Sequence, residues 1–201
     1  MRHTLFIGAL VTCLAALSIR GSSAPQGGAG AKAPGPPVPY EDVGACPFEG
    51  CVYREWIANA RVDVRSGRRP DDPIVFSLRR GDRVQAITGI VVTVKPGRVQ
   101  FKAPVDLASS AGPVHVQPGE TLYLLTYHGE GETTAWFKGR LYDRLDGTEF
   151  FNALCEDRPA ACNGSILERP QRVWWVRLRS VRGVMGWTQE TEKLDNKDAL
   201  G

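Results

Sequence analysis

Histidine is scarce in this sequence, and the catalytic and metal-binding motifs that need it are missing. Three histidines occur in 201 residues, and only His115 and His128 lie beyond residue 24. Nucleophilic catalysis needs a base within hydrogen-bonding reach of a cysteine or serine, and no Cys-His-polar set is evident. There is no His-Glu-His metal spacing, and the acids near Asp146 lack the alternation of a calcium loop. We therefore expect no enzyme, no cofactor and no metal site, and we place His128 at the end of a hairpin.

The sequence also lacks an apolar run long enough to span a bilayer comfortably. The run at residues 5–19 follows a short positive start and precedes the small residues 22–24, which is typical of a secretory signal peptide. We predict a signal at residues 1–24, no transmembrane span after its removal, and an exported protein of the periplasm, cell envelope or extracellular space. An uncleaved anchor and a lipoprotein acylated at Cys13 are the alternatives.

Excess charge of one sign is missing as well. Removal of residues 1–24 takes away Arg2 and Arg20 and no acid, which lowers the formal net charge from +3 to +1. Such a balance gives no argument for a nucleic-acid partner. Arginines do cluster between residues 65 and 83, but aspartates are interleaved with them, so a solvated face of mixed charge is the favoured interpretation.

Four cysteines remain beyond the predicted signal, and an even number in an exported chain indicates disulfides. Three pairings are open. We favour the two local ones, Cys46–Cys51 and Cys155–Cys162, because each pair brackets a short loop that contains proline. A four-cysteine zinc site is the alternative, but intervals of four and six residues fit the usual zinc patterns poorly.

Strand patterns dominate what is present, and helical periodicity is almost absent. Residues 25–44 are rich in Pro, Gly and Ala and are predicted to be a linker. Beyond them, β-branched and aromatic runs alternate with Gly- and Pro-containing turns, which predicts an all-β fold. Residues 172–190 form the clearest unit: a strand, a turn at residues 180–183 and a return strand in which Gly186 permits close backbone approach. Residues 191–201 are expected to be a charged tail with one helical turn.

One internal repeat is visible. Residues 78–88 can be laid over residues 116–126, with a shared pattern of an apolar residue, two variable residues, glycine, an acid and then an apolar strand. Each copy is expected to be a turn that leads into a buried strand.

Several of these segments resemble bacterial SH3-like domains. Residues 62–66 (VDVRS), 74–78 (IVFSL) and 81–84 (GDRV) look like the opening half, in which a V-x-V-R-S strand leads through a long loop to a V-x-x-L-x-x-G-D-x-V strand. Trp175, Gly183 and Gly186-Trp187 look like the closing W-x-x-V strand, glycine turn and G-W strand. The resemblance covers about half of the mature chain and implies small SH3-like barrels, with a loop held by a disulfide.

The spacing departs from that family, because roughly ninety residues separate Val84 from Trp175. Two arrangements follow. In one, two SH3-like units lie in tandem at residues 45–106 and 113–190; in the other, one barrel carries a long β-rich insertion. The repeat favours the tandem arrangement.

An aromatic surface is the best candidate for a binding site, since rings on one face of a small barrel often form a groove for peptides or glycans. The candidates are Trp136, Trp174, Tyr127 and Tyr142. Trp174 and Trp175 are neighbours on one strand and must face opposite sides. We expect Trp175 to be partly buried, and Trp174 to pack under the disulfide loop or to be exposed.

We therefore predict an exported, non-catalytic SH3-like binding module of the bacterial cell envelope. Its expected ligand is peptidoglycan, a peptide or an envelope protein. The alternative is a structural scaffold protein of an envelope complex with no ligand site of its own, and an enzyme with an unrecognised site is the third hypothesis.

Overall fold

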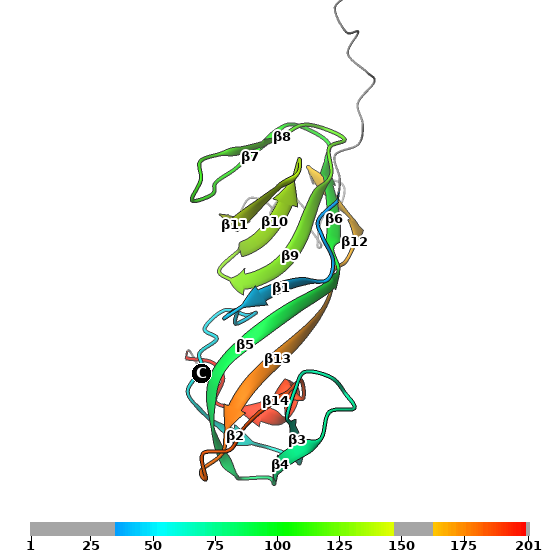
Figure 1. Cartoon of the computed structure of the whole chain (residues 1–201). Coiled ribbons are helices and arrows are strands. Elements are labelled where there is room, and N and C mark those ends of the chain that lie inside the picture. Colours follow the sequence, from blue (N-terminus) through cyan, green and yellow to red (C-terminus); the bar gives the residue numbers. More distant parts are fainter. Residues whose placement is uncertain (1–34, 147–162, 200–201) are drawn as a thin grey trace, which may run out of the picture. The chain divides into compact units, whose positions relative to one another are not determined.

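The computed structural model of the chain describes residues 35–146 and 163–199, which are drawn in colour in Figure 1. Within these residues the protein is all-β, as the sequence predicts, and its only helical element is the 3-10 turn η2 (Thr191–Lys193). The predicted signal at residues 1–24, with Cys13, lies outside the described residues. So does the predicted Cys155–Cys162 disulfide.

The strands form three antiparallel sheets. The largest has eight strands, in the order β15-β2-β5-β13-β14-β3-β4 with β1 also paired to β5; the second has the order β11-β10-β9-β6-β12, and β7 and β8 form a pair. The strand bounds are β1 (Tyr40–Val43), β2 (Glu55–Ala58), β3 (Val62–Arg65), β4 (Ile74–Leu78), β5 (Arg83–Lys95), β6 (Gly97–Phe101), β7 (Val105–Leu107), β8 (Val114–Val116), β9 (Leu122–Gly129), β10 (Glu132–Phe137), β11 (Arg140–Asp146), β12 (Gly164–Glu168), β13 (Gln171–Arg179), β14 (Met185–Thr188) and β15 (Leu194–Asp195).

The eight-stranded sheet curls around its own core. Leu194 on β15 and Leu78 on β4 stand at opposite edges of the sheet, yet both belong to one buried cluster. A flat sheet cannot bring its edges together, so the sheet must be strongly coiled. We call this cluster the first core; its members are Trp56, Ala58, Val62, Val64, Leu78, Val84, Ala86, Val176, Leu178 and Leu194.

A separate second core lies between the five-stranded sheet and the β7–β8 pair. Its residues alternate along the strands with more exposed ones, as in Gly97–Phe101, because successive side chains point to opposite faces. The members are Val99, Phe101, Leu107, Val114, Val116, Leu122, Leu124, Ala135, Phe137 and Leu145. All of them come from one continuous stretch, whereas the first core combines residues from before and after that stretch.

The strand pairing therefore crosses the boundary between the predicted units 45–106 and 113–190. Strand β5 is 13 residues long. Its start contributes to the first core, and its residues from Gln85 to Lys95 pair with β13 from the far end of the chain. The β-branched residues of β5 continue without a glycine or proline turn until Pro96. The chain therefore stays in the eight-stranded sheet up to Lys95 and enters the five-stranded sheet with β6. The second core is thus inserted between the strands that build the first.

Both copies of the sequence repeat form the same turn. Asp82 accepts a hydrogen bond from the amide of Arg79 at 2.7 Å, and Glu120 accepts one from the amide of Gln117 at 2.9 Å. The intervening Gly81 and Gly119 have φ of 89° and 80°, a left-handed conformation that favours glycine. Each turn leads into a strand that supplies one core: β5 for the first, β9 for the second.

The β13–β14 hairpin forms where the sequence predicts it, with Val176 opposite Thr188. A Cβ on Gly186 would lie 2.6 Å from the carbonyl oxygen of Arg65, so the close approach expected at this glycine brings β14 against β3. Two segments differ from expectation. Within the predicted linker 25–44, Tyr40–Val43 forms strand β1. The predicted charged tail 191–201 contains Leu194, which is buried in the first core.

Candidate functional site

Trp174 is a packing residue of an aromatic cluster. Its ring centroid lies 6.0 Å from Phe48, 6.4 Å from Tyr53 and 5.9 Å from Trp56. The Nε1–H of Trp174 donates to the Tyr53 hydroxyl at 3.2 Å, and that hydroxyl donates to the carbonyl of Ala45. Phe48 lies within the Cys46–Cys51 loop, so Trp174 packs under a disulfide loop and faces away from Trp175, which is 6% exposed.

Trp136 belongs to a different surface, an outward row across the five-stranded sheet. Trp136 is directly opposite Leu141 on β11 and Tyr123 on β9, and Tyr123 is opposite Arg98 on β6. Directly paired residues share one face of a sheet. The neighbours of these residues along each strand, such as Ala135 and Phe137, are in the second core, so the row faces away from it. We call Leu141, Trp136, Tyr123 and Arg98 the aromatic row.

Tyr142 and Tyr127 do not join this row. Tyr142 follows Leu141 on β11 and packs against the second core, while Arg140 stacks over its ring at 5.0 Å. Tyr127 pairs with Thr133 beyond a register shift between β9 and β10, and its side chain is partly exposed. Of the four predicted ligand residues, Trp136 alone is thus placed on the aromatic row.

A residue of the Pro-rich segment approaches the aromatic row. A Cβ on Gly35 would lie 3.8 Å from both Cζ and the hydroxyl of Tyr123, an ordinary van der Waals distance. Gly35 begins the sequence Gly-Pro-Pro-Val-Pro, which favours an extended backbone. The ring of Tyr123 is therefore placed to contact an extended chain.

The eight-stranded sheet carries an open hollow beside its long β3–β4 loop. Glu41, Arg68, Arg69, Asp72, Val92 and Trp175 line it. Its charges are paired: Arg68 forms a bidentate pair with Glu41 at 3.0 and 3.1 Å, and Arg69 binds Asp72 at 3.1 Å. The guanidinium of Arg68 also lies 5.7 Å from the ring centroid of Trp187. These paired groups tie the loop to β1 and β14.

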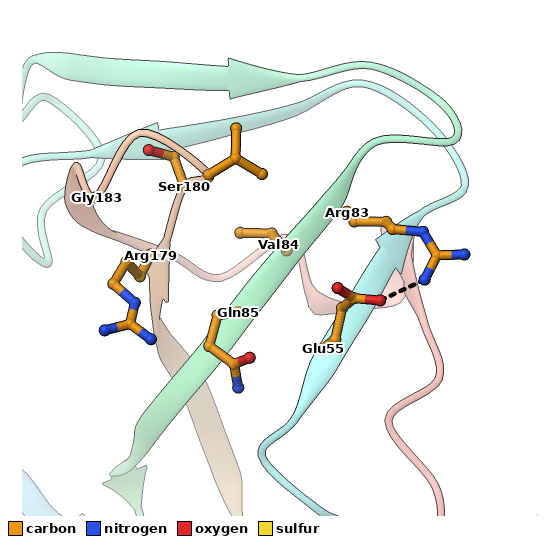
Figure 2. A pocket seen from close by; sticks show the side chains of 8 residues that line it. Glu55, Arg83, Val84, Gln85, Arg179, Ser180 and Gly183 are labelled. Carbon is orange, nitrogen blue, oxygen red and sulfur yellow. Dashed lines mark hydrogen bonds and ion pairs between the residues drawn. The ribbon is translucent and has the colours of Figure 1, made fainter.

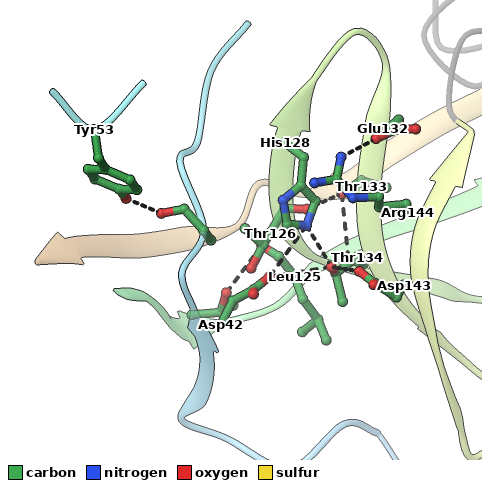
Figure 3. Close-up of polar contacts among 12 residues, drawn as sticks. Asp42, Tyr53, Leu125, Thr126, His128, Glu132, Thr133, Thr134, Asp143 and Arg144 are labelled. Carbon is green, nitrogen blue, oxygen red and sulfur yellow. Dashed lines mark hydrogen bonds and ion pairs between the residues drawn. The ribbon is translucent and has the colours of Figure 1, made fainter. Parts of the chain in front are cut away.

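A buried polar network, shown in Figure 3, connects β1 to β9, β10 and β11. Nε2 of His128 lies 2.8 Å from Oγ1 of Thr134 and 3.4 Å from Oδ2 of Asp42. Oγ1 of Thr134 also lies 3.3 Å from Oδ1 of Asp143. The side chains of His128 and Asp42 are only 8% and 17% exposed. The sequence prediction of His128 as a simple hairpin-end residue missed this network, because β1 lies more than 80 residues away along the chain.

The network carries charge but not the geometry of a catalytic relay. Burial acts to raise the pKa of Asp42, but hydrogen bonds from His128 and neighbouring hydroxyls outweigh it and lower that pKa below its usual value. In a catalytic triad the two ring nitrogens of histidine contact different partners. Here Asp42 and Thr134 both lie against Nε2 of His128, so the arrangement suits a structural link between strands.

Within residues 35–146 and 163–199, no group of three or more His, Cys, Asp or Glu side chains is arranged to hold a metal ion. The predicted Cys46–Cys51 disulfide is present, with Cα atoms 5.5 Å apart. In the same part of the chain, no helix has the length and apolar character needed to cross a membrane. Neither a family model, nor a curated protein, nor a solved structure matches this chain.

Proposed function

We propose that this protein is an exported, non-catalytic SH3-like binding module of the bacterial cell envelope, with one barrel inserted into another. The observation that carries the proposal is the aromatic row, in which two large rings, Tyr123 and Trp136, stand side by side on the outward face of a sheet. Rings in such a row supply apolar contact area and stacking to an extended peptide or to the sugar faces of a glycan.

Two further observations support the barrel interpretation. The residues that resemble the opening and closing halves of the family contribute to one core, although roughly ninety residues separate them: Val62 and Leu78 pack with Val176 and Leu178. The Gly-acid turn of that opening half recurs at Gly119, ahead of the strand that supplies the second core. The disulfide Cys46–Cys51 supports an oxidising compartment.

Peptidoglycan is the ligand to test first, because it offers both an extended glycan and a peptide. The purified protein is incubated with isolated cell wall, and the bound fraction is measured for the parent, Trp136→Ala and Tyr123→Ala. Loss of a stacking ring is expected to weaken binding roughly tenfold. Trp187→Ala is the matched control, since Trp187 is also a partly exposed tryptophan but lies on the other sheet.

Equal binding by the parent and Trp136→Ala, with both proteins folded, would show that the aromatic row is not the site. If the parent does not bind cell wall or its isolated peptides at low salt, the scaffold hypothesis takes precedence. Export is tested separately: the mass of the protein recovered from an expressing bacterium should lack residues 1–24.

A further inference from the structure

A concentration of unpaired arginines lies at one end of the eight-stranded sheet. Strands β5 and β13 are antiparallel, with Gln85 at the start of β5 opposite Arg179 at the end of β13. The β4–β5 turn at residues 79–83 and the β13–β14 turn at residues 179–184 therefore stand at the same end. Figure 2 shows the hollow that they share, lined by Glu55, Arg83, Val84, Gln85, Arg179, Ser180, Val181 and Gly183.

The β13–β14 turn holds an apolar side chain out into water. Its backbone is closed by hydrogen bonds from Gly183 N to Ser180 O and from Ser180 N to Val184 O, both 2.9 Å. The Ser180 hydroxyl accepts a third from the Val184 amide at 3.1 Å. At the tip, Val181 is 89% exposed, and Val184 is 41% exposed. Small polar residues usually occupy such a tip, and this valine makes no contribution to either core.

Positive charges outnumber negative ones around this hollow. Five arginines stand on the two turns: Arg79, Arg80, Arg83, Arg179 and Arg182. Arg83 pairs with Glu55, and Asp82, whose carboxylate accepts a hydrogen bond from the backbone amide of Arg79, keeps its negative charge. The five arginines therefore face two acids, which leaves a clear positive excess. Among the described residues, the side chains of the other four arginines have no hydrogen bond or ion pair. By contrast, Arg68 and Arg69 on the neighbouring loop are paired with acids.

We propose that the turns at residues 79–83 and 179–184 dock on a membrane surface that carries anionic phospholipid headgroups. The four unpaired arginines complement phosphate and their long side chains can reach up from the interface. Val181, at the tip between Arg179 and Arg182, enters the interfacial layer. An acidic polymer such as a polysaccharide would also attract the arginines. It offers no apolar layer for the exposed side chain of Val181, however, so the valine favours a membrane as the partner. The surface is distinct from the aromatic row, which belongs to the other sheet.

Co-sedimentation of the full chain with vesicles tests the proposal. One set of vesicles contains equal amounts of phosphatidylcholine and phosphatidylglycerol, and the other contains phosphatidylcholine alone. Neutral vesicles report any binding through the apolar residues 5–19. Those residues and the flanking Arg2 and Arg20 are the same in every variant, so a difference between variants on anionic vesicles reports the two turns. Each arginine near an anionic surface contributes roughly fivefold to the partition coefficient. Arg179→Gln/Arg182→Gln should therefore bind the anionic vesicles roughly 25-fold more weakly than the parent, and Val181→Ser at least about threefold more weakly.

Matched controls separate the tip from general charge and hydrophobicity. Lys102→Gln removes an exposed charge near the second core, and Val43→Ser removes a valine that is 72% exposed on β1. Both should bind as the parent does. Hydrogen exchange of residues 179–184 should slow on anionic vesicles and not on neutral ones.

Three results would overturn the proposal. They are equal binding of the parent to both vesicle types, unchanged binding of the double arginine variant, and binding that depends on the arginines but not on Val181. The last result, together with tight binding to heparin, would identify a site for soluble polyanions instead.

Discussion

Gly89 is the position at which a single added methyl group should perturb the aromatic cluster most directly. It lies in the middle of β5, opposite Val176. A Cβ at this position would stand 2.1 Å from the hydroxyl oxygen of Tyr53 and 2.5 Å from Nε1 of Trp174. Both distances are far below van der Waals contact, so Gly89→Ala must displace the two groups whose hydrogen bonds connect the cluster to Ala45.

The expected loss of stability follows from three contributions. Overpacking of a filled site costs about 1–3 kcal/mol. Disruption of the hydrogen bonds of Trp174 and Tyr53 adds about 1 kcal/mol each. Replacement of glycine by alanine in a strand offsets about 0.5–1 kcal/mol of this loss, because alanine lowers the conformational entropy of the unfolded chain. The net expectation is a decrease of about 3 kcal/mol in the free energy of unfolding, which corresponds to a urea midpoint lower by about 1.5 M.

Urea unfolding followed by tryptophan fluorescence measures this change, and a double-mutant cycle tests its cause. Tyr53→Phe removes the oxygen nearest to the new methyl group, so Gly89→Ala should be less destabilising in the Tyr53→Phe background than in the parent, by about 1–2 kcal/mol. Val94→Ala, on the same strand at a residue that is 49% exposed, is the control and should change stability by no more than about 0.5 kcal/mol. A Gly89→Ala protein as stable as the parent, or strict additivity in the cycle, would refute the packing argument.

The remaining predictions concern the network, the hairpin and the disulfide. Hydrogen bonding to His128 helps to lower the pKa of Asp42 on folding. Asp42 therefore stabilises the folded state above its unfolded pKa of about 3.9, and this stability is lost as pH falls through the lower folded value. Asp42→Asn should flatten the acid limb of a curve of unfolding free energy against pH, and an unchanged limb would contradict a stabilising contact between Asp42 and His128. Gly186→Ala should lower the free energy of unfolding by about 1–3 kcal/mol, measured by urea unfolding, since the nearest backbone atom leaves no room for a Cβ; a neutral effect would contradict the close approach of β14 to β3. Cys46→Ser/Cys51→Ser should lower the free energy of unfolding by about 2 kcal/mol, the loop-closure value for a short loop. Reduction of the parent protein with dithiothreitol should give the same loss. A parent protein whose stability does not change on reduction would argue against the disulfide.

Local features of the sequence were sufficient to predict the hairpin, the all-β class and the disulfide loop. Gly186 beside Trp187 indicated close backbone approach, and adjacent Trp174 and Trp175 had to face opposite sides of a strand. The structure has both features. These predictions succeed because alternation and turn chemistry are properties of neighbouring residues.

Contacts between distant segments could not be predicted in the same way. The repeat at Gly81 and Gly119 correctly indicated two similar turns, but it gave no information on which strands would pair, so the tandem boundaries near residues 106 and 113 differ from the observed cores. The sequence placed His128 correctly at a hairpin end, but it gave no sign of the polar network, because nothing near His128 in the chain signals the approach of Asp42 on β1. Likewise, the charged composition of residues 191–201 concealed one buried leucine, Leu194.

The long strand β5 has a consequence for the order in which the protein can fold. Between the end of β5 and the start of β13, 75 residues are synthesised, and the strands that supply the second core up to β11 are complete by then. The first core has to wait for β13, β14 and β15, so it depends on contacts of high sequence separation, which form slowly. Until β13 emerges from the ribosome, much of β5 lacks its neighbour and presents an open edge of Val and Ile residues that can pair with another chain. Chaperone demand during synthesis should therefore be concentrated in the interval between β5 and β13.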